Sequence, residues 1–127
     1  MIYFAHPSSI DYIELYEAIL NSADLKQYNF FLPHKESRKG VNSFDIVRNC
    51  DLFIAEVSAP STGLGIEIGR AEAAGVPILL VLKEGAEFSN CFEFVCPKPE
   101  RLTYQNASDM VVKVSEYLKC PCLNVKT

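Results

Sequence analysis

The feature that most constrains the fold is a pair of short, almost wholly apolar runs that flank one helix-like segment. The runs are DLFIAEV at 51–57 and VPILLVL at 76–82, and the segment between them, 63–74, ends just before Gly75. An apolar run without alternation predicts a strand buried on both faces, as in parallel sheets covered by helices. Glycine is the residue most often found directly after a helix. We therefore expect a strand–helix–strand unit here.

The rest of the chain repeats this alternation of strands and helices. Further strands are predicted at 1–5, 27–33 and either 92–96 or 101–105, and further helices at 10–23, 42–49 and 107–118. The alternation favours a single-domain α/β fold, doubly wound in the Rossmann or flavodoxin-like manner, with a five-stranded parallel sheet and helices on both faces. This domain is expected to cover residues 1–119, and 120–127 to form a loose C-terminal tail. In a sheet of order 2-1-3-4-5, the ligand lies beyond the carboxyl ends of the first and third strands.

Composition and charge argue against several classes of protein. The chain has 127 residues, and its formal net charge is −4. An acidic chain does not fit a broad basic surface for a nucleic acid polymer, and the longest apolar run is too short to span a membrane. The N-terminus lacks a basic leader, and five cysteines in no zinc-ligand spacing indicate reduced thiols without a metal. We expect a cytoplasmic protein with no nucleic acid or membrane partner.

The loop after the predicted strand 51–57 leads directly into the predicted helix. Its sequence, SAPSTGLG, offers hydroxyl groups at Ser58 and Ser61 and glycines at Gly63 and Gly65. Glycine lets backbone N–H groups come close to a ligand, and a helix start favours an anion. The sequence is neither a Walker A loop nor the dinucleotide fingerprint. The loop is therefore either an anion site or an ordinary capped helix start.

Glu67 lies in the first or second turn of this predicted helix. The helix dipole stabilises a carboxylate there in its ionised form. Leu64, Ile68 and Ala71 share the side of the helix that faces the sheet, and Glu67 borders that side. Its carboxylate would then point along the sheet edge into the expected crevice. The alternative is a half-exposed surface glutamate paired with Arg70, three residues later.

A row of small residues, Gly65, Gly69 and Ala73, recurs at a spacing of four along the same helix, with Ile66 beside it. Residues four apart lie on one helix face, and small side chains there permit close approach of another helix. The row predicts either the interface of a homodimer or close packing within one chain.

The segment CDLFIAEVSAPSTGLGIEIGRAEAAGVPILLV, residues 50–81, resembles the nucleoside 2-deoxyribosyltransferase superfamily, especially its small 2'-deoxynucleoside 5'-phosphate N-hydrolase branch. The family has an apolar strand that ends in Ala-Glu, then a Pro-Ser loop, and then a helix with the motif Gly-x-Glu-apolar-Gly. The chain matches this pattern at Asp51, Ala55, Glu56, Ser58, Pro60, Ser61, Gly63, Gly65, Glu67, Gly69 and Ala71.

The resemblance implies a role for each matched residue of the motif. Glu67 would be the nucleophile that attacks the anomeric carbon of deoxyribose and displaces the base. The covalent glycosyl-enzyme would then pass to water in a hydrolase, or to another base in a transferase. Ser61 with the backbone of Gly63 and Gly65 would receive a 5'-phosphate, and Tyr3 would flank or hydrogen-bond the substrate. A serine at position 61 favours the hydrolase branch.

The chain departs from the family pattern in its helix at 42–49. The family has an aspartate where this chain has Ser43. Asp45 lies about 200° away around an ideal helix, so it replaces that aspartate only if the helix register shifts.

The first loop departs as well, since it reads AHPSS where the hydrolases carry a glycine, a serine and an arginine. His6, Ser8 or Ser9 would make the ligand contacts there. In the hydrolase branch a serine of the neighbouring subunit completes the phosphate pocket, and Ser89 is the candidate for that residue.

Taken with the crevice argument, the resemblance predicts an N-glycosidase that cleaves the base–sugar bond of (deoxy)nucleoside 5'-monophosphates. It would act through Glu67 as a homodimer, with no metal and no cofactor. A nucleoside deoxyribosyltransferase that exchanges bases is the alternative among enzymes. A non-catalytic nucleotide-binding domain is the alternative outside them.

Overall fold

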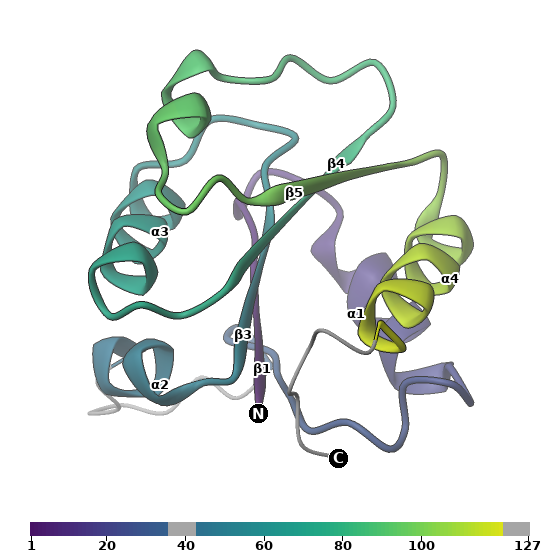
Figure 1. Ribbon diagram of the computed structural model, residues 1–127. Helices are drawn as coiled ribbons and strands as arrows, with labels where there is room; N and C mark the ends of the chain where they lie inside the picture. The colour runs from purple at the N-terminus through teal and green to yellow at the C-terminus, as the bar shows by residue number, and fades with distance from the viewer. Residues whose placement is uncertain (36–42, 121–127) are drawn as a thin grey trace.

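A parallel sheet of five strands, in the order β2-β1-β3-β4-β5, forms the centre of the molecule (Figure 1). The computed structural model describes residues 1–35 and 43–120. The strands are β1 (Ile2–Ala5), β2 (Phe30–Phe31), β3 (Leu52–Glu56), β4 (Ile78–Lys83) and β5 (Glu100–Tyr104). The helices are α1 (Tyr12–Asn21), α2 (Ser43–Asn49), α3 (Thr62–Ala73), α4 (Ala107–Leu118) and a short 3-10 helix, η1 (Asn90–Phe94). This confirms the predicted α/β fold class and strand order.

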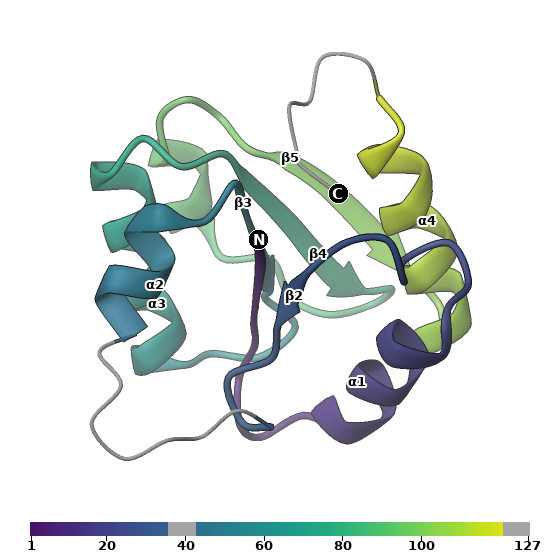
Figure 2. The same ribbon diagram turned by 90° about the horizontal axis from the view of Figure 1, so that it is seen from below.

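Helices α1 and α4 cover one face of the sheet, and α2 and α3 cover the other (Figure 1, Figure 2). Successive side chains of a strand point to opposite faces, so each strand contributes to two cores. In β1, Ile2 and Phe4 pack with α1 and α4, whereas Tyr3 and Ala5 pack with α2 and α3. The near-continuous apolar runs of the sequence arise from this double burial.

The edge elements differ most from the predicted boundaries. The predicted strand at 27–33 is reduced to β2, which within residues 1–35 and 43–120 pairs through Phe30 and Phe31 with β1 alone. Helix α1 begins two residues after the predicted start, because the Asp11 side chain caps it by accepting the Glu14 N–H at 3.3 Å.

The fifth strand occupies the second of its two predicted places, and the alternative at 92–96 is wrong. The Ser89 hydroxyl accepts the Cys91 N–H at 3.3 Å and starts the 3-10 helix η1 there. Of the predicted C-terminal tail, only Cys120 lies within the described residues.

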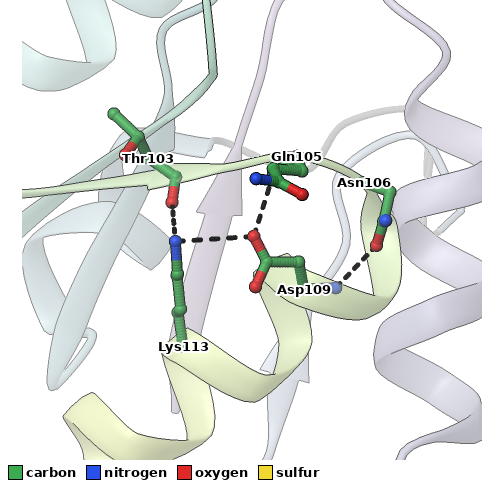
Figure 3. A network of polar contacts seen from close by, with 5 residues as sticks. All are labelled: Thr103, Gln105, Asn106, Asp109 and Lys113. Carbon is green, nitrogen blue, oxygen red and sulfur yellow. Dashed lines mark hydrogen bonds and ion pairs between the residues drawn. The ribbon is translucent and has the colours of Figure 1, made fainter.

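The end of β5 is tied to α4 by a network of polar contacts (Figure 3). Asn106 caps α4 by accepting the Asp109 N–H at 2.9 Å, and Asp109 accepts the Gln105 N–H at 2.9 Å. The Lys113 ammonium donates to the Thr103 carbonyl at 2.6 Å. The Gln105 hydrogen bond, with help from Lys113, holds the pKa of the exposed Asp109 carboxyl below its usual value. These contacts hold the two-residue connection between the end of β5 at Tyr104 and the start of α4 at Ala107.

Within residues 1–35 and 43–120, no helix has the length and apolar character needed to cross a membrane. Cys50, Cys91 and Cys96 form no disulfide. Burial raises the pKa of the Cys50 thiol to about 11, so this thiol is a core side chain and not a reactive one.

Candidate active site

A cavity of about 350 Å³ opens at the carboxyl ends of β1 and β2, beside α2 and α3. Residues of β1 and of α3, the helix that follows β3, line it, and the strand order reverses between β1 and β3, the usual ligand position in a doubly wound sheet. The cavity is lined by Tyr3, His6, Pro33, His34, Ser43, Phe44, Gly63, Ile66 and Glu67.

Glu67 projects from the second turn of α3, and its carboxyl accepts a hydrogen bond from the Tyr3 hydroxyl at Oε2. Tyr3 is itself held in place, because its ring stacks between Phe31 at 5.2 Å and Phe53 at 5.3 Å. The sheet-facing side of α3 is the predicted one, with Leu64 buried against β3. The carboxyl group therefore has a fixed position at the cavity wall.

The surroundings of Glu67 act on its protonation in opposite directions. Burial raises the pKa of the Glu67 carboxyl, whereas the Tyr3 hydrogen bond and the charge of His34 lower it, and burial is the larger effect. Burial and the bond to Glu67 raise the pKa of Tyr3, so the phenol keeps its proton and remains a donor. A half-buried carboxylate with one fixed donor is suited to act as a nucleophile or as a base.

The loop that precedes α3 is built as a helix cap. The Ser61 hydroxyl accepts the Leu64 N–H at 3.3 Å, and the Ser61 carbonyl accepts the Gly65 N–H at 3.0 Å. By helix geometry, the N–H groups of Thr62 and Gly63 have no intrahelical partner. The helix start thus presents two backbone donors and the Ser61 hydroxyl.

The residues expected to bind phosphate divide between two cavities. Gly63 lines the cavity that contains Glu67. Ser58, Ser61, Gly65 and Ser89 of the same subunit line a second cavity of about 610 Å³, on the other side of the loop. The residues that line the two cavities come within two positions of each other at the start of α3, at Ser61 and Gly63.

Three of the residues expected at the ligand lie away from both cavities. Asp45 is exposed on α2, and its carboxylate pairs with Arg48 at 2.6 Å. Ser43, two residues earlier, is the one that lines the first cavity. Ser8 and Ser9 are exposed in the turn after β1 and line neither cavity.

Arg70 does not pair with Glu67. Its guanidinium lies over the ring of Phe44 instead and so joins α3 to α2. Within the described residues, the structure therefore shows Glu67 bonded to Tyr3 and turned toward the cavity, not an ion pair on the helix surface.

A buried carboxyl group supports the loop from below. Glu56 is 1% exposed, and it accepts the Ser58 N–H at 2.5 Å, the Ser58 hydroxyl at 3.0 Å and the hydroxyl of Tyr104. The Ser58 hydroxyl oxygen in turn accepts the Lys83 N–H at 2.8 Å. The sequence showed Glu56 only as a motif match, although a charged residue in an apolar strand is itself a signal.

The aromatic wall of the cavity was missed by sequence reasoning. His34 and Pro33 follow β2, and Phe44 comes from the first turn of α2. The predicted strand order placed the second strand beside the first. The residues that follow the second strand could therefore have been predicted to line the site from the sheet geometry alone.

His6 lies deeper in the cavity than a loop residue would. It is buried, with Nδ1 at 2.8 Å from the Pro7 carbonyl and Nε2 at 2.5 Å from the Tyr16 hydroxyl.

In residues 1–35 and 43–120, no three His, Cys, Asp or Glu side chains come together in a group that could hold a metal ion.

The fold and the cavity define a class: a doubly wound α/β protein with a hydrogen-bonded carboxylate at the carboxyl edge of its sheet. No protein-family model matches the chain. Over 65 residues it is 42% identical to the putative 2'-deoxynucleoside 5'-phosphate N-hydrolase 1 of Syntrophotalea carbinolica, a match that covers 50% of this chain and 46% of that protein. Over 37 residues it is 49% identical to the 5-hydroxymethyl-dUMP N-hydrolase of Mus musculus, covering 29% of this chain and 21% of that one.

A solved structure shares the fold over most of the chain. The CMP N-glycosidase of Clostridium botulinum superposes with a TM-score of 0.66 at 23% identity, covering 90% of this chain and 98% of the other. The sequence matches confirm the resemblance to the nucleoside 2-deoxyribosyltransferase superfamily, close to its N-hydrolase branch. The chain spans about half the length of the first of these relatives, with 46% of it matched.

Proposed function

We propose that this chain is an N-glycosidase that cleaves the base–sugar bond of (deoxy)nucleoside 5'-monophosphates. The observation that carries the proposal is the Glu67 carboxyl, held by the Tyr3 hydroxyl at the wall of a cavity on the carboxyl edge of the sheet. The names of the similar proteins, two nucleotide N-hydrolases and a CMP N-glycosidase, support the same reaction class.

The proposed mechanism follows the retaining glycosidases. Tyr3 occupies Oε2 of Glu67, so Oε1 attacks the anomeric carbon C1'. A bond forms between Oε1 and C1' as the C1'–N bond breaks, and its electron pair leaves with the base. Water then attacks C1' of the glycosyl-enzyme and releases the sugar phosphate with retained configuration. This chemistry is carried by side chains alone.

The 5'-phosphate is proposed to lie at the start of α3. The Ser61 hydroxyl and the N–H groups of Thr62 and Gly63 converge there, and the helix dipole adds to the attraction for an anion. Gly65 offers no donor, since its N–H is bonded to the Ser61 carbonyl. A phosphate at this point lies one helical turn from Glu67, which places the sugar between them.

The direct test is a panel of nucleoside and deoxynucleoside monophosphates, incubated with the protein with and without a free acceptor base. Base release is followed by chromatography. Release in water alone supports the hydrolase, and base exchange identifies a transferase instead. Saturable nucleotide binding without turnover across the panel would refute the enzyme and indicate a binding domain.

Replacing Tyr3 by Phe is expected to move the acidic limb of kcat/KM to higher pH. The Tyr3 hydrogen bond lowers the pKa of Glu67, which burial has already raised, so its loss raises that pKa further. Attack requires the ionised carboxylate, so activity is then lost at a higher pH as the solution is acidified. The measurement is the pH profile of kcat/KM, which reports the free enzyme.

The control for this change is Tyr28→Phe, which removes a phenol from a residue outside the cavity. An acidic limb that stays in place, or moves to lower pH, in the Tyr3 variant would contradict the assigned role of the phenol.

We further propose that two copies of the chain pack through the small-residue face of α3. Gly65 and Gly69 are exposed, and a Cβ built on either meets no atom within 4 Å. Ile66, beside them, leaves 50% of its surface exposed. An open, small and partly apolar helix face is suited to close contact with a second copy.

Replacing Gly69 by Glu is therefore expected to convert a dimer to a monomer, as measured by light scattering on a sizing column. The chain itself should lose no stability, because glutamate replaces glycine in an exposed helix position at a gain of roughly 0.5–1 kcal/mol. Val112→Glu on α4, where Val112 is 52% exposed, is the matched control and should stay dimeric. A wild-type monomer, or a dimer that survives the Gly69 change, would refute this interface.

A further inference from the structure

Of the described residues that line the cavity, four carry a group able to hold or exchange a proton: Tyr3, His6, His34 and Glu67. Cleavage of a base–sugar bond requires a nucleophile, and it is accelerated by an acid that protonates the departing base. Glu67 fills the first role in the proposed function. The geometry of the other three decides which one can fill the second.

Tyr3 is already engaged. Its hydroxyl proton is donated to Glu67, and its ring is stacked between Phe31 and Phe53. Transfer of that proton to the base would remove the hydrogen bond that lowers the pKa of Glu67. Tyr3 therefore serves the nucleophile and not the base.

His6 is engaged through both of its ring nitrogens. The Pro7 carbonyl can only accept, so Nδ1, 2.8 Å away, carries the hydrogen. Nε2 then accepts from the Tyr16 hydroxyl at 2.5 Å. Burial also lowers the pKa of His6, which keeps the ring neutral. A neutral imidazole with both nitrogens bonded has no proton to give to a ligand.

His34 stands at the mouth of the cavity with its imidazole exposed. Its backbone N–H donates to the Tyr16 hydroxyl at 3.2 Å, which fixes the turn after β2. Its ring lies 4.9 Å from the ring of His6 and 4.8 Å from that of Tyr12. In the described part of the chain, these ring contacts position the imidazole without a hydrogen bond at either nitrogen.

His34 and Glu67 both line the cavity, and the charge of His34 lowers the pKa of the Glu67 carboxyl. The cavity therefore holds a carboxyl group on α3 and an imidazole after β2. A nucleophile and an acid supplied by two different elements can act on one substrate bound in the same cavity.

We propose that His34 is the catalytic acid of this site, an inference that rests on the proposed N-glycosidase function. As Oε1 of Glu67 bonds to C1', the electron pair of the C1'–N bond passes to the base, and His34 donates its proton to that base. In the second half-reaction the neutral imidazole takes a proton from the water that attacks C1'. Each residue returns to its starting state, and no other reactant is needed.

The groups that face His34 define how its role depends on pH. They are His6 at the end of β1, Tyr12 and Tyr16 of α1, and Glu67 of α3, with Lys35 next in the chain. Activity requires Glu67 ionised and His34 protonated, so the rate falls on both sides of an optimum. Removal of the imidazole should abolish the alkaline limb that His34 causes and leave the acidic limb of Glu67.

The test compares two leaving groups in two variants. His34→Gln removes the acid, and His34→Phe removes it but keeps the ring contacts with Tyr12 and His6. On a deoxynucleoside 5'-monophosphate, we expect kcat to fall about 100-fold in both variants. On a deoxyribose 5-phosphate whose leaving group is 4-nitrophenolate, which departs without a proton, kcat should change less than about 5-fold. Lys35→Gln, in the same exposed turn, is the control and should match the wild type on both.

The outcomes separate the two claims. Equal losses on both substrates, wild-type rates on the nucleotide, or an alkaline limb that persists in both variants would overturn the role of His34 alone. A wild-type protein that releases neither the base nor 4-nitrophenolate would overturn the proposed function, and the role of His34 with it.

Discussion

Replacing Glu67 by Gln is expected to reduce base release by about 10⁴-fold or more, because the amide cannot form the glycosyl bond to C1'. The cavity should otherwise persist, since Gln keeps the shape of the side chain and can still accept the Tyr3 hydroxyl hydrogen bond. The loss should therefore appear in kcat, with nucleotide binding by calorimetry little changed. In the wild type, mass spectrometry of quenched reactions should find the deoxyribose phosphate adduct on the peptide that contains Glu67.

Glu17→Gln is the matched control, because it makes the same change on an exposed position of α1. It should leave both turnover and adduct formation unchanged. Full activity in the Glu67 variant would exclude this residue as the nucleophile. Turnover with inverted configuration at C1' would exclude the covalent route even if Glu67 proves essential.

Replacing Glu56 by Ala is expected to lower the free energy of unfolding by roughly 3 kcal/mol, the largest stability effect that a single polar substitution should have here. The change leaves the Ser58 N–H and the Tyr104 hydroxyl without their acceptor and opens a void in the core. Both donors then lose a partner beside a carboxyl group that is 1% exposed. Urea unfolding followed by circular dichroism measures the loss.

Two further variants separate the contribution of the Tyr104 hydrogen bond from the total loss of stability and provide a control. Tyr104→Phe removes one donor and leaves Glu56 with its Ser58 contacts, so a loss of roughly 1 kcal/mol is expected. Glu100→Ala, on the same strand as Tyr104 but exposed, is the control and should change stability by no more than roughly 0.5 kcal/mol. A Glu56 variant as stable as the control would show that the buried carboxyl adds nothing to the fold.

Most of the fold could be predicted from the sequence because its signals are local. The runs at 51–57 and 76–82 are apolar throughout, since β3 and β4 are covered on both faces. The edges of the sheet carried weaker signals. Within the described residues, strand β2 pairs with β1 alone. The mostly apolar residues at 92–96 predicted a strand, whereas the Ser89 cap starts the 3-10 helix η1 there.

The candidate site could be predicted only in part, because its residues meet through tertiary contacts. The resemblance and the sheet geometry together pointed to Glu67 and Tyr3, which lie 64 positions apart and share a hydrogen bond. Helix geometry indicated the direction of the Glu67 side chain, but neither source settled which residue of the helix at 42–49 faces the cavity. Asp45 was weighed against Ser43 on helix angle, and the structure puts Ser43 at the cavity and pairs Asp45 with Arg48.

His34 is a residue of the site that the sequence did not indicate. Nothing in the pattern PHK marks a histidine as part of a site, and its position depends on the Tyr16 hydroxyl, which comes from a different element. Contacts of this kind depend on the turn after β2 and on α1 at once. The sequence of one segment alone therefore does not predict such contacts between distant segments.

The residues of the candidate site are anchored in two separate hydrophobic cores, one on each face of the sheet. Tyr3 and Glu67 belong to the layer of α2 and α3, whereas His34 rests on the rings of Tyr12 and His6, beside α1. The sheet separates these two layers, and they meet at its carboxyl edge, where Tyr3, Glu67 and His34 line one cavity. A lineage could therefore repack α1 and retune the cavity for a different leaving base while Tyr3 and Glu67 stay unaltered.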